Sequence, residues 1–312
     1  MTGRRRKPTH QRGVALLAAL LVVAVGLLLL AALLQTGDMQ RARSGYLLRH
    51  EQAWQLARGM EAWGARTLRE ARQRSVGVDS LDDPWLQPIA PVPLPAGQIS
   101  GRLIDRGGCF NVNSLLRVDG SDDPLAAARL KRLLRAASLP ESLLPTLQDW
   151  VDPDFSPRAS GAEDATYRGR PPGYLAANAP MLDLSELRLL NGVDNATYAR
   201  LRSLLCALPQ DAAINLNTAP IEVWMALDER VTAAMARQLS MDGHARYGGI
   251  DAIRAALKRQ GVEGVSLEGC SVGTRYFRAS ILVEADATPY RFGALLRRDK
   301  NGVAVLRRWQ GD

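Results

Sequence analysis

Carboxylates gather in one short stretch of the sequence, between Asp149 and Asp164. The stretch reads DWVDPDFSPRASGAED, and its prolines, serines and glycine favour a loop over a helix. A loop can bend several hard oxygen ligands around one ion, and Ca²⁺ takes roughly six to eight such oxygens. We expect the carboxylate ligands of such an ion to be Asp152, Asp154, Glu163 and Asp164.

Two other interpretations of this acidic loop remain open. An acidic loop can simply be solvated, and two carboxylates can act as general acid and base in a hydrolase. No nucleophile motif or glycine-rich phosphate loop accompanies them, and the three histidines, His10, His50 and His244, show no metal-ligand spacing. The sequence therefore favours a protein that is not an enzyme.

Helical patterns surround the acidic loop. Apolar residues at helical spacing predict helices over 125–137, 142–150, 184–190 and 196–208, with Ser185 as an N-cap candidate for the third.

Two similar phrases divide this helical region. They are FNVNS at 110–114 and INLNT at 214–218, and each leads into a helical pattern. We expect the second Asn, or the Ser or Thr after it, to cap the following helix. Their similarity predicts two related helical modules.

Strand patterns lie on both sides of the helical region. Alternating residues predict strands over 98–105, 274–283, 290–297 and 303–309, and Asn301-Gly302 predicts a hairpin turn between the last two. The proline-rich stretch 83–95 is expected to separate the first strand from the preceding helix. The fold class predicted is α+β.

The chain starts with a basic segment and a long apolar one. Residues 14–34 hold no polar or charged side chain and form about 31 Å of helix, the thickness of a bilayer core. A cleaved signal peptide is the alternative, although its apolar region is usually shorter. Because the cations precede the apolar run, the positive-inside rule predicts a cytoplasmic N-terminus and places residues 35–312 outside the cytoplasm.

The helix is expected to continue beyond the membrane. From Tyr46 to Arg74 the less polar residues recur every three or four positions, as in an amphipathic helix. One helix over 14–74 would be on the order of 90 Å long. The alternative is two helices, with a break near Gly37 or Gly45.

The net charge of +8 suggests a nucleic-acid partner at first sight. Five basic residues and no acid lie within residues 1–13, which leaves +3 for the rest of the chain. Residues 214–260 are similar to a helix-hairpin-helix, which holds DNA phosphates on backbone N–H groups. Its hairpin here reads LDERV at 227–231, with two acids and no glycine. A membrane-anchored nucleic-acid-binding protein is therefore only the alternative function.

Three cysteines leave at least one thiol unpaired within the chain. We expect a disulfide between Cys206 and Cys270, since both lie where the helical region gives way to extended segments. Free buried thiols are an alternative, and Cys109 can replace either partner.

The residues at the boundary of the apolar run resemble the type IV prepilin class. In that class a dedicated prepilin peptidase cuts after a glycine, which here corresponds to a cut between Gly13 and Val14. Most members carry Glu five residues after the cut, where it pairs with the amino terminus of a neighbouring subunit. Here that residue is Ala18, which suits the first position of a filament.

A set of phrases in order along nearly the whole chain resembles the K-type minor pseudopilins of the type II secretion system, also called general secretion pathway protein K. The phrases are RGVALL at 12–17, FNVN at 110–113, DWVD at 149–152, GAED at 161–164, SELRLL at 185–190, INLNTA at 214–219 and VGTRYF at 272–277. The absence of Glu at the fifth mature position is itself a mark of this family.

The resemblance implies a pilin-like fold with a large inserted α-helical domain, calcium binding in that domain, and a complex with the I-type and J-type pseudopilins at the pseudopilus tip. It also implies contacts with other pseudopilins through the N-terminal helix, and a bacterial inner-membrane protein with a periplasmic head. The expected divisions are a leader at 1–13, a membrane helix at 14–34, an amphipathic helix and first strand at 35–109, an inserted domain at 110–270 and C-terminal strands at 271–312.

Overall fold

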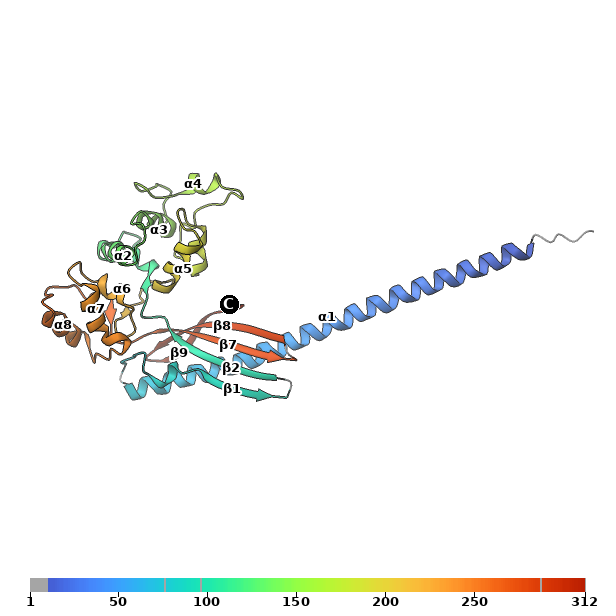
Figure 1. Ribbon diagram of the computed structural model, residues 1–312, viewed down its shortest axis with the longest axis horizontal. Coiled ribbons are helices and arrows are strands. Elements are labelled where there is room, and N and C mark those ends of the chain that lie inside the picture. The colour runs from blue at the N-terminus through green and yellow to red at the C-terminus, as the bar shows by residue number, and fades with distance from the viewer. Residues whose placement is uncertain (1–10, 76, 96, 287, 312) are drawn as a thin grey trace, which may run out of the picture. The chain divides into compact units, whose positions relative to one another are not determined.

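The computed structural model describes residues 11–75, 77–95, 97–286 and 288–311 (Figure 1). The chain divides into two compact units, residues 1–56 and 57–312. Helix α1, Gln11–Ser75, runs through the boundary without interruption, so the alternative of a break near Gly37 or Gly45 is wrong.

The first unit consists of the apolar part of α1 and the turns that follow it. From Val14 on, the helix is long and apolar enough to cross a membrane, with a mean hydropathy of 3.1 in its most apolar window. None of that window is buried in the protein. This exposed surface needs lipid or other helices to cover it.

The second unit contains a five-stranded antiparallel sheet. Its strands lie in the order β1-β2-β7-β8-β9, with β1 at Ile89–Leu94, β2 at Gly97–Asp105, β7 at Tyr276–Ala285, β8 at Thr288–Asp299 and β9 at Gly302–Gln310. The four predicted strands are confirmed, and the Asn301-Gly302 turn joins β8 to β9. The fold is therefore α+β.

Strand β1 was not expected, because it lies within the proline-rich stretch. Pro91 and Pro93 cannot donate to a strand ladder, but β1 is an edge strand and pairs only with β2. The same stretch also forms the short 3₁₀ helix η1, Pro84–Leu86.

The last turns of α1 pack on one face of the sheet. Gly64 lies against the side chain of Leu103 on β2, where an added Cβ would come within 3.2 Å. Glu61 of α1 accepts two hydrogen bonds of 2.8 Å from the guanidinium of Arg308 on β9. These contacts fix the register of helix against sheet in the second unit.

All the shorter α-helices lie between β2 and β7 in the chain. They are α2 at Pro124–Ala136, α3 at Leu143–Val151, α4 at Asp164–Arg168, α5 at Asn195–Leu204, α6 at Ile221–Met225, α7 at Ala233–Ser240 and α8 at Ile250–Arg259. Three 3₁₀ helices join them, η2 at Val112–Leu115, η3 at Leu184–Leu189 and η4 at Met241–Gly243. One cluster of buried apolar residues, centred on side chains such as Leu130, Leu147 and Trp224, forms their core.

Two predicted helices differ in detail. The helix expected over 184–190 is the 3₁₀ helix η3, Leu184–Leu189, and its N-cap is Asp183 rather than Ser185, since Asp183 and Glu186 form a reciprocal capping box. The helix expected to reach residue 208 ends at Leu204, because Leu205 and Cys206 form strand β4.

The two similar phrases begin two structurally equivalent modules. In the first, β3 (Phe110–Asn111) pairs in parallel with β4 (Leu205–Cys206). In the second, β5 (Ile214–Asn215) pairs in parallel with β6 (Cys270–Ser271). The predicted internal repeat thus corresponds to a repeated strand pairing.

The asparagines of the phrases have other roles than expected. In the first phrase the cap is the first Asn, since the side-chain oxygen of Asn111 accepts from the backbone N–H of Asn113 at the start of η2. In the second phrase the side-chain oxygen of Asn215 accepts from the N–H of Asn217 within a turn, and the N-cap residue of α6 is Pro220. The second Asn binds loops instead. Asn113 donates to the carbonyls of Met181 and Leu208 and accepts from the N–H of Met181. Asn217 donates to Tyr247 and Val272 and accepts from the N–H of Tyr247.

The expected disulfide between Cys206 and Cys270 is wrong. Cys206 is bonded to Cys109, and Cys270 is free. The reason is the parallel pairing of β3 with β4, which brings the Cα atoms of Cys109 and Cys206 to 5.8 Å. Cys270 lies in β6 and pairs with the other module's strand.

Candidate metal centre

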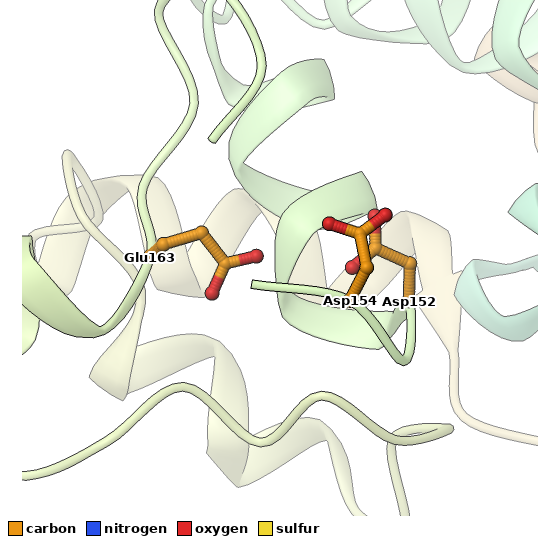
Figure 2. A group of neighbouring side chains, drawn as sticks. All are labelled: Asp152, Asp154 and Glu163. Carbon is orange, nitrogen blue, oxygen red and sulfur yellow. The ribbon is translucent and has the colours of Figure 1, made fainter. Parts of the chain in front are cut away.

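Three of the four expected ligands come together at the end of α3 and the start of α4. Asp152 is the C-cap residue of α3, Asp154 follows it in the loop, and Glu163 is the N-cap residue of α4. One carboxylate oxygen from each lies within 4.8 Å of the others. Figure 2 shows the Glu163 side chain pointing across the loop toward the two aspartates.

Several oxygens of this cluster are buried without hydrogen-bond partners. Asp152 is 2% exposed and Glu163 is 3% exposed. Within the described part of the chain, Asp152 Oδ1 and both carboxylate oxygens of Glu163 accept no hydrogen bond. A buried anionic oxygen without a partner is costly, so the donor set fits a bound cation.

Two carboxyl groups of the cluster, Glu163 and Asp152, have raised pKa values. Burial is the main cause that raises the pKa of Glu163 to about 7, and the negative charges of Asp149, Asp152 and Asp154 contribute to the same shift. Burial also raises the pKa of Asp152, opposed by hydrogen bonding to Arg158. A divalent cation among these carboxylates would favour their ionised forms.

Arg158 partly neutralises the cluster and was not singled out by the sequence. Its Nη1 donates to Asp152 and, at 2.8 Å, to Asp149 Oδ1, while Nη2 donates to Asp122 Oδ1 at 2.8 Å. Asp149 is completely buried, and a Cβ on Gly161 would lie 1.9 Å from Asp149 Oδ2. The one cation within the run of acids was the available signal for this role.

Asp164, the fourth expected ligand, does not join the cluster. It is the first residue of α4, where Oδ1 accepts from the N–H of Ala176 at 3.0 Å and Oδ2 accepts from Arg168 at 2.9 Å. The adjacent Glu163 points to the cluster, whereas Asp164 makes hydrogen bonds to Arg168 within α4 and to the loop at Ala176.

The other residues singled out by sequence lie elsewhere. Gly13 and Val14 are both in α1, and the Val14 side chain is 69% exposed. His50 stacks on Tyr46 at 6.3 Å, His244 contacts Asp82 at 2.8 Å, and His10 lies outside the described residues.

The hairpin proposed as a phosphate site carries its own anion. Between α6 and α7, the carboxylate of Asp228 accepts from the backbone N–H of Arg230 at 3.0 Å and from its guanidinium at 2.7 Å. A phosphate would meet this carboxylate in place of free N–H groups. The structure gives the nucleic-acid alternative no support.

Comparisons with known proteins agree on one family. The family model described as "Type II secretion system (T2SS), protein K" matches residues 108–210. The type II secretion system protein K of Pseudomonas aeruginosa is 34% identical over 96% of this chain and 93% of its own length. That of Aeromonas hydrophila is 30% identical over 97% of this chain and 98% of its own length.

A solved structure has the same fold. It is the crystal structure of the GspK-GspI-GspJ complex from the enterotoxigenic Escherichia coli type 2 secretion system, and the matched chain has a TM-score of 0.74 and 26% sequence identity. The match covers 86% of this chain and 99% of that chain.

Proposed function

Because this chain belongs to the type II secretion system protein K family, we propose that it acts as a minor pseudopilin at the tip of the pseudopilus, without enzymatic activity. One observation carries the proposal: a 65-residue helix with an exposed apolar beginning is combined with a sheet that bears a large helical insertion. Ala18 supports the tip position, since it offers no carboxylate to the amino terminus of a subunit ahead of it.

Labelling of the head on isolated pseudopili tests the tip position. We expect gold label at one end of each filament, and loss of protein secretion when the chain is deleted. Label spread along the filament shaft would contradict the tip position while leaving the role in secretion intact.

We infer that the partners at the tip are the I-type and J-type pseudopilins of the same bacterium, as in the complex of the solved relative. Other pseudopilins would contact the exposed apolar surface of α1, which replaces lipid by helix packing when the subunit leaves the membrane. Co-purification of the three heads in equal amounts tests the contact with the I-type and J-type pseudopilins. If the head of this chain elutes separately from both of them, the inference is contradicted.

We propose that residues 14–34 anchor the chain in the inner membrane, with the leader cytoplasmic and the head periplasmic, until prepilin peptidase cuts between Gly13 and Val14. The intact mass of the membrane-extracted protein tests this. We expect a mass that lacks residues 1–13, and retention of the leader in a Gly13→Val variant. A wild-type mass that includes the leader would contradict the cleavage.

We propose that Asp152, Asp154 and Glu163 hold a structural Ca²⁺. The support is their hard-oxygen donor set and the three buried oxygens without hydrogen-bond partners. The ion would supply positive charge that lets the buried carboxylates ionise, and so join the end of α3 to the start of α4.

Titration calorimetry with Ca²⁺ tests the site. We expect binding to be lost when Asp152→Asn and Glu163→Gln are combined, and kept in an Asp164→Asn variant, because Asp164 lies outside the cluster. Wild-type protein that releases no heat at millimolar Ca²⁺ would contradict the proposal.

A further inference from the structure

One guanidinium lies beside the proposed metal site and contacts one of its expected ligands. Arg158 Nη1 donates to Asp152 Oδ2 and, at 2.8 Å, to Asp149 Oδ1. The backbone N–H of Arg158 also donates to Asp149 Oδ2, at 3.2 Å. Asp149 lies in α3 and Asp152 is the C-cap residue of that helix, so one residue of the loop holds both carboxylates at the end of α3.

The two oxygens of Asp152 have different surroundings. Oδ2 accepts the hydrogen bond from Arg158, whereas Oδ1 is buried and has no hydrogen-bond partner among the described residues. A carboxylate that is held at one oxygen cannot turn freely about its side-chain torsions. Arg158 therefore keeps Oδ1 of Asp152 as the oxygen that remains available to an ion.

The other two clustered ligands are held differently. In the part of the chain that the structure describes, Asp154 accepts from the backbone N–H of Ser156 at 2.7 Å, and neither oxygen of Glu163 accepts a hydrogen bond. Side chains that orient a metal ligand without touching the metal contribute about 10- to 100-fold to metal affinity. The contact between Arg158 and Asp152 is of this kind.

The charge of Arg158 acts against its hydrogen bond, because a cation beside the site repels a second cation. Two carboxylates outside the clustered ligands balance this charge. They are Asp149, which is completely buried, and Asp122, whose Oδ1 accepts from Arg158 Nη2 at 2.8 Å. The Arg158 side chain is also 26% exposed, so water screens part of its field. We therefore expect the orientation of Asp152 to outweigh the repulsion.

We propose that Arg158 is a positioning residue of the metal site, which holds Asp152 in the orientation that binds a divalent cation and so strengthens binding although it is itself a cation. The inference rests on the proposed Ca²⁺ site. It adds to that site a residue that contacts a ligand and does not contact the ion.

Binding of Ca²⁺ and Tb³⁺ to the full chain in detergent micelles tests the proposal. Titration calorimetry measures the Ca²⁺ affinity, and the luminescence lifetimes of bound Tb³⁺ in H₂O and D₂O give the number of waters on the ion. In an Arg158→Gln variant we expect the Ca²⁺ affinity to fall about tenfold or more. Because Asp152 is then no longer held, we also expect about one more water on Tb³⁺ in its place.

An Arg158→Lys variant separates orientation from charge. Lysine keeps the positive charge and a donor for Asp152, but it lacks the planar fork of donors that arginine offers. We expect a loss of Ca²⁺ affinity that is smaller than in Arg158→Gln. If the glutamine variant fails to fold, the lysine variant decides alone, and an unchanged or raised Ca²⁺ affinity in it contradicts the proposal.

The matched control is Arg168→Gln. Arg168 also donates to a carboxylate beside the cluster, that of Asp164 at 2.9 Å, but Asp164 is not one of the clustered ligands. The control should leave the Ca²⁺ affinity and the waters on Tb³⁺ unchanged. In an Asp152→Ala background, Arg158→Gln should cause no further loss of Tb³⁺ affinity, because the ligand through which Arg158 acts is already removed.

Three results overturn the proposal: a Ca²⁺ affinity that is unchanged or higher in Arg158→Gln, an equal loss of affinity in Arg168→Gln, or a full effect of Arg158→Gln in the Asp152→Ala background. Wild-type protein that binds no Ca²⁺ would instead contradict the metal site itself, and the role of Arg158 with it. The two failures are therefore told apart by the wild-type titration.

Discussion

Arg298 of β8 donates to the carboxylate of Asp79, and the two side chains are 1% and 0% exposed. Asp79 also accepts from the backbone N–H of Thr274 at 2.8 Å, and Thr274 Oγ1 donates to Asp105. Asp79 follows α1, Asp105 ends β2 and Thr274 precedes β7. One buried ion pair therefore joins the helix, the sheet and both ends of the helical insertion.

Removal of the Arg298 cation should destabilise the protein strongly. In an Arg298→Met variant, Asp79 stays buried without a counter-charge, so we expect the free energy of unfolding to fall by about 3–5 kcal/mol. Urea unfolding followed by tryptophan fluorescence measures it. Adding Asp79→Asn should recover part of the loss. If Asp79→Asn instead lowers the free energy of unfolding of the Arg298→Met variant as much as it lowers that of the wild type, the two side chains are not coupled and the prediction is wrong.

The second asparagines of the two modules should contribute similar stability. Asn113→Ala and Asn217→Ala each remove three hydrogen bonds to buried loop backbone, and we expect each to cost about 2–4 kcal/mol. Thermal unfolding compares them, with the exposed Asn195→Ala as a near-neutral control. A large cost in one module and none in the other would show that the equivalence is geometric only.

Without metal, stability should fall as pH rises through the range where Glu163 titrates. The native state keeps its proton to about pH 7, whereas an unperturbed glutamate releases it near 4.5. The native state binds more protons between these values, so the free energy of unfolding decreases there, by about 1–3 kcal/mol. Urea unfolding in EDTA from pH 4.5 to 8 measures this slope. The Glu163→Gln substitution should flatten the pH dependence of the free energy of unfolding. If the slope is the same in that variant, other titrating groups cause it and the prediction is wrong.

The three cysteines should behave as one disulfide, between Cys109 and Cys206, and one free thiol at Cys270. Alkylation of the denatured, unreduced protein should modify Cys270 alone, and reduction should expose all three. Replacing both Cys109 and Cys206 by Ser should lower the free energy of unfolding by about 2–5 kcal/mol, since the bond closes a long loop. Cys270→Ser is the control and should change little. Modification of Cys109 without reduction would disprove the pairing.

Local patterns in the sequence predicted most of the elements. The apolar run, the period of α1, four strands and the Asn-Gly turn all depend on neighbouring residues, and the structure confirms them. Strand β1 was missed because prolines argue against a strand unless the strand lies at an edge, and edge position is a property of the whole sheet.

Features that depend on distant pairing could not be predicted. Cys109 meets Cys206 because β3 pairs with β4 across 97 residues of chain. The sequence pointed to carboxylates in this loop, of which Asp152, Asp154 and Glu163 lie together. Whether Glu163 or Asp164 joins them depends on which side chain turns inward at the first turn of α4. The position of Arg158 beside the carboxylates results from the fold of the loop, and its spacing in the sequence does not predict it.

The neighbours Asp105 and Phe277 face each other in the β2–β7 register, so the chain leaves and re-enters the sheet at adjacent points. The entire helical insertion thus occupies the place of a hairpin loop. A short turn that joined these two residues would keep the β2–β7 register, but it would remove Tyr276 from β7 and the contacts of Thr274 with Asp79 and Asp105. The strand register therefore sets no limit on the length of the insertion, while Thr274 at its end ties it to the scaffold through Asp79 and Asp105.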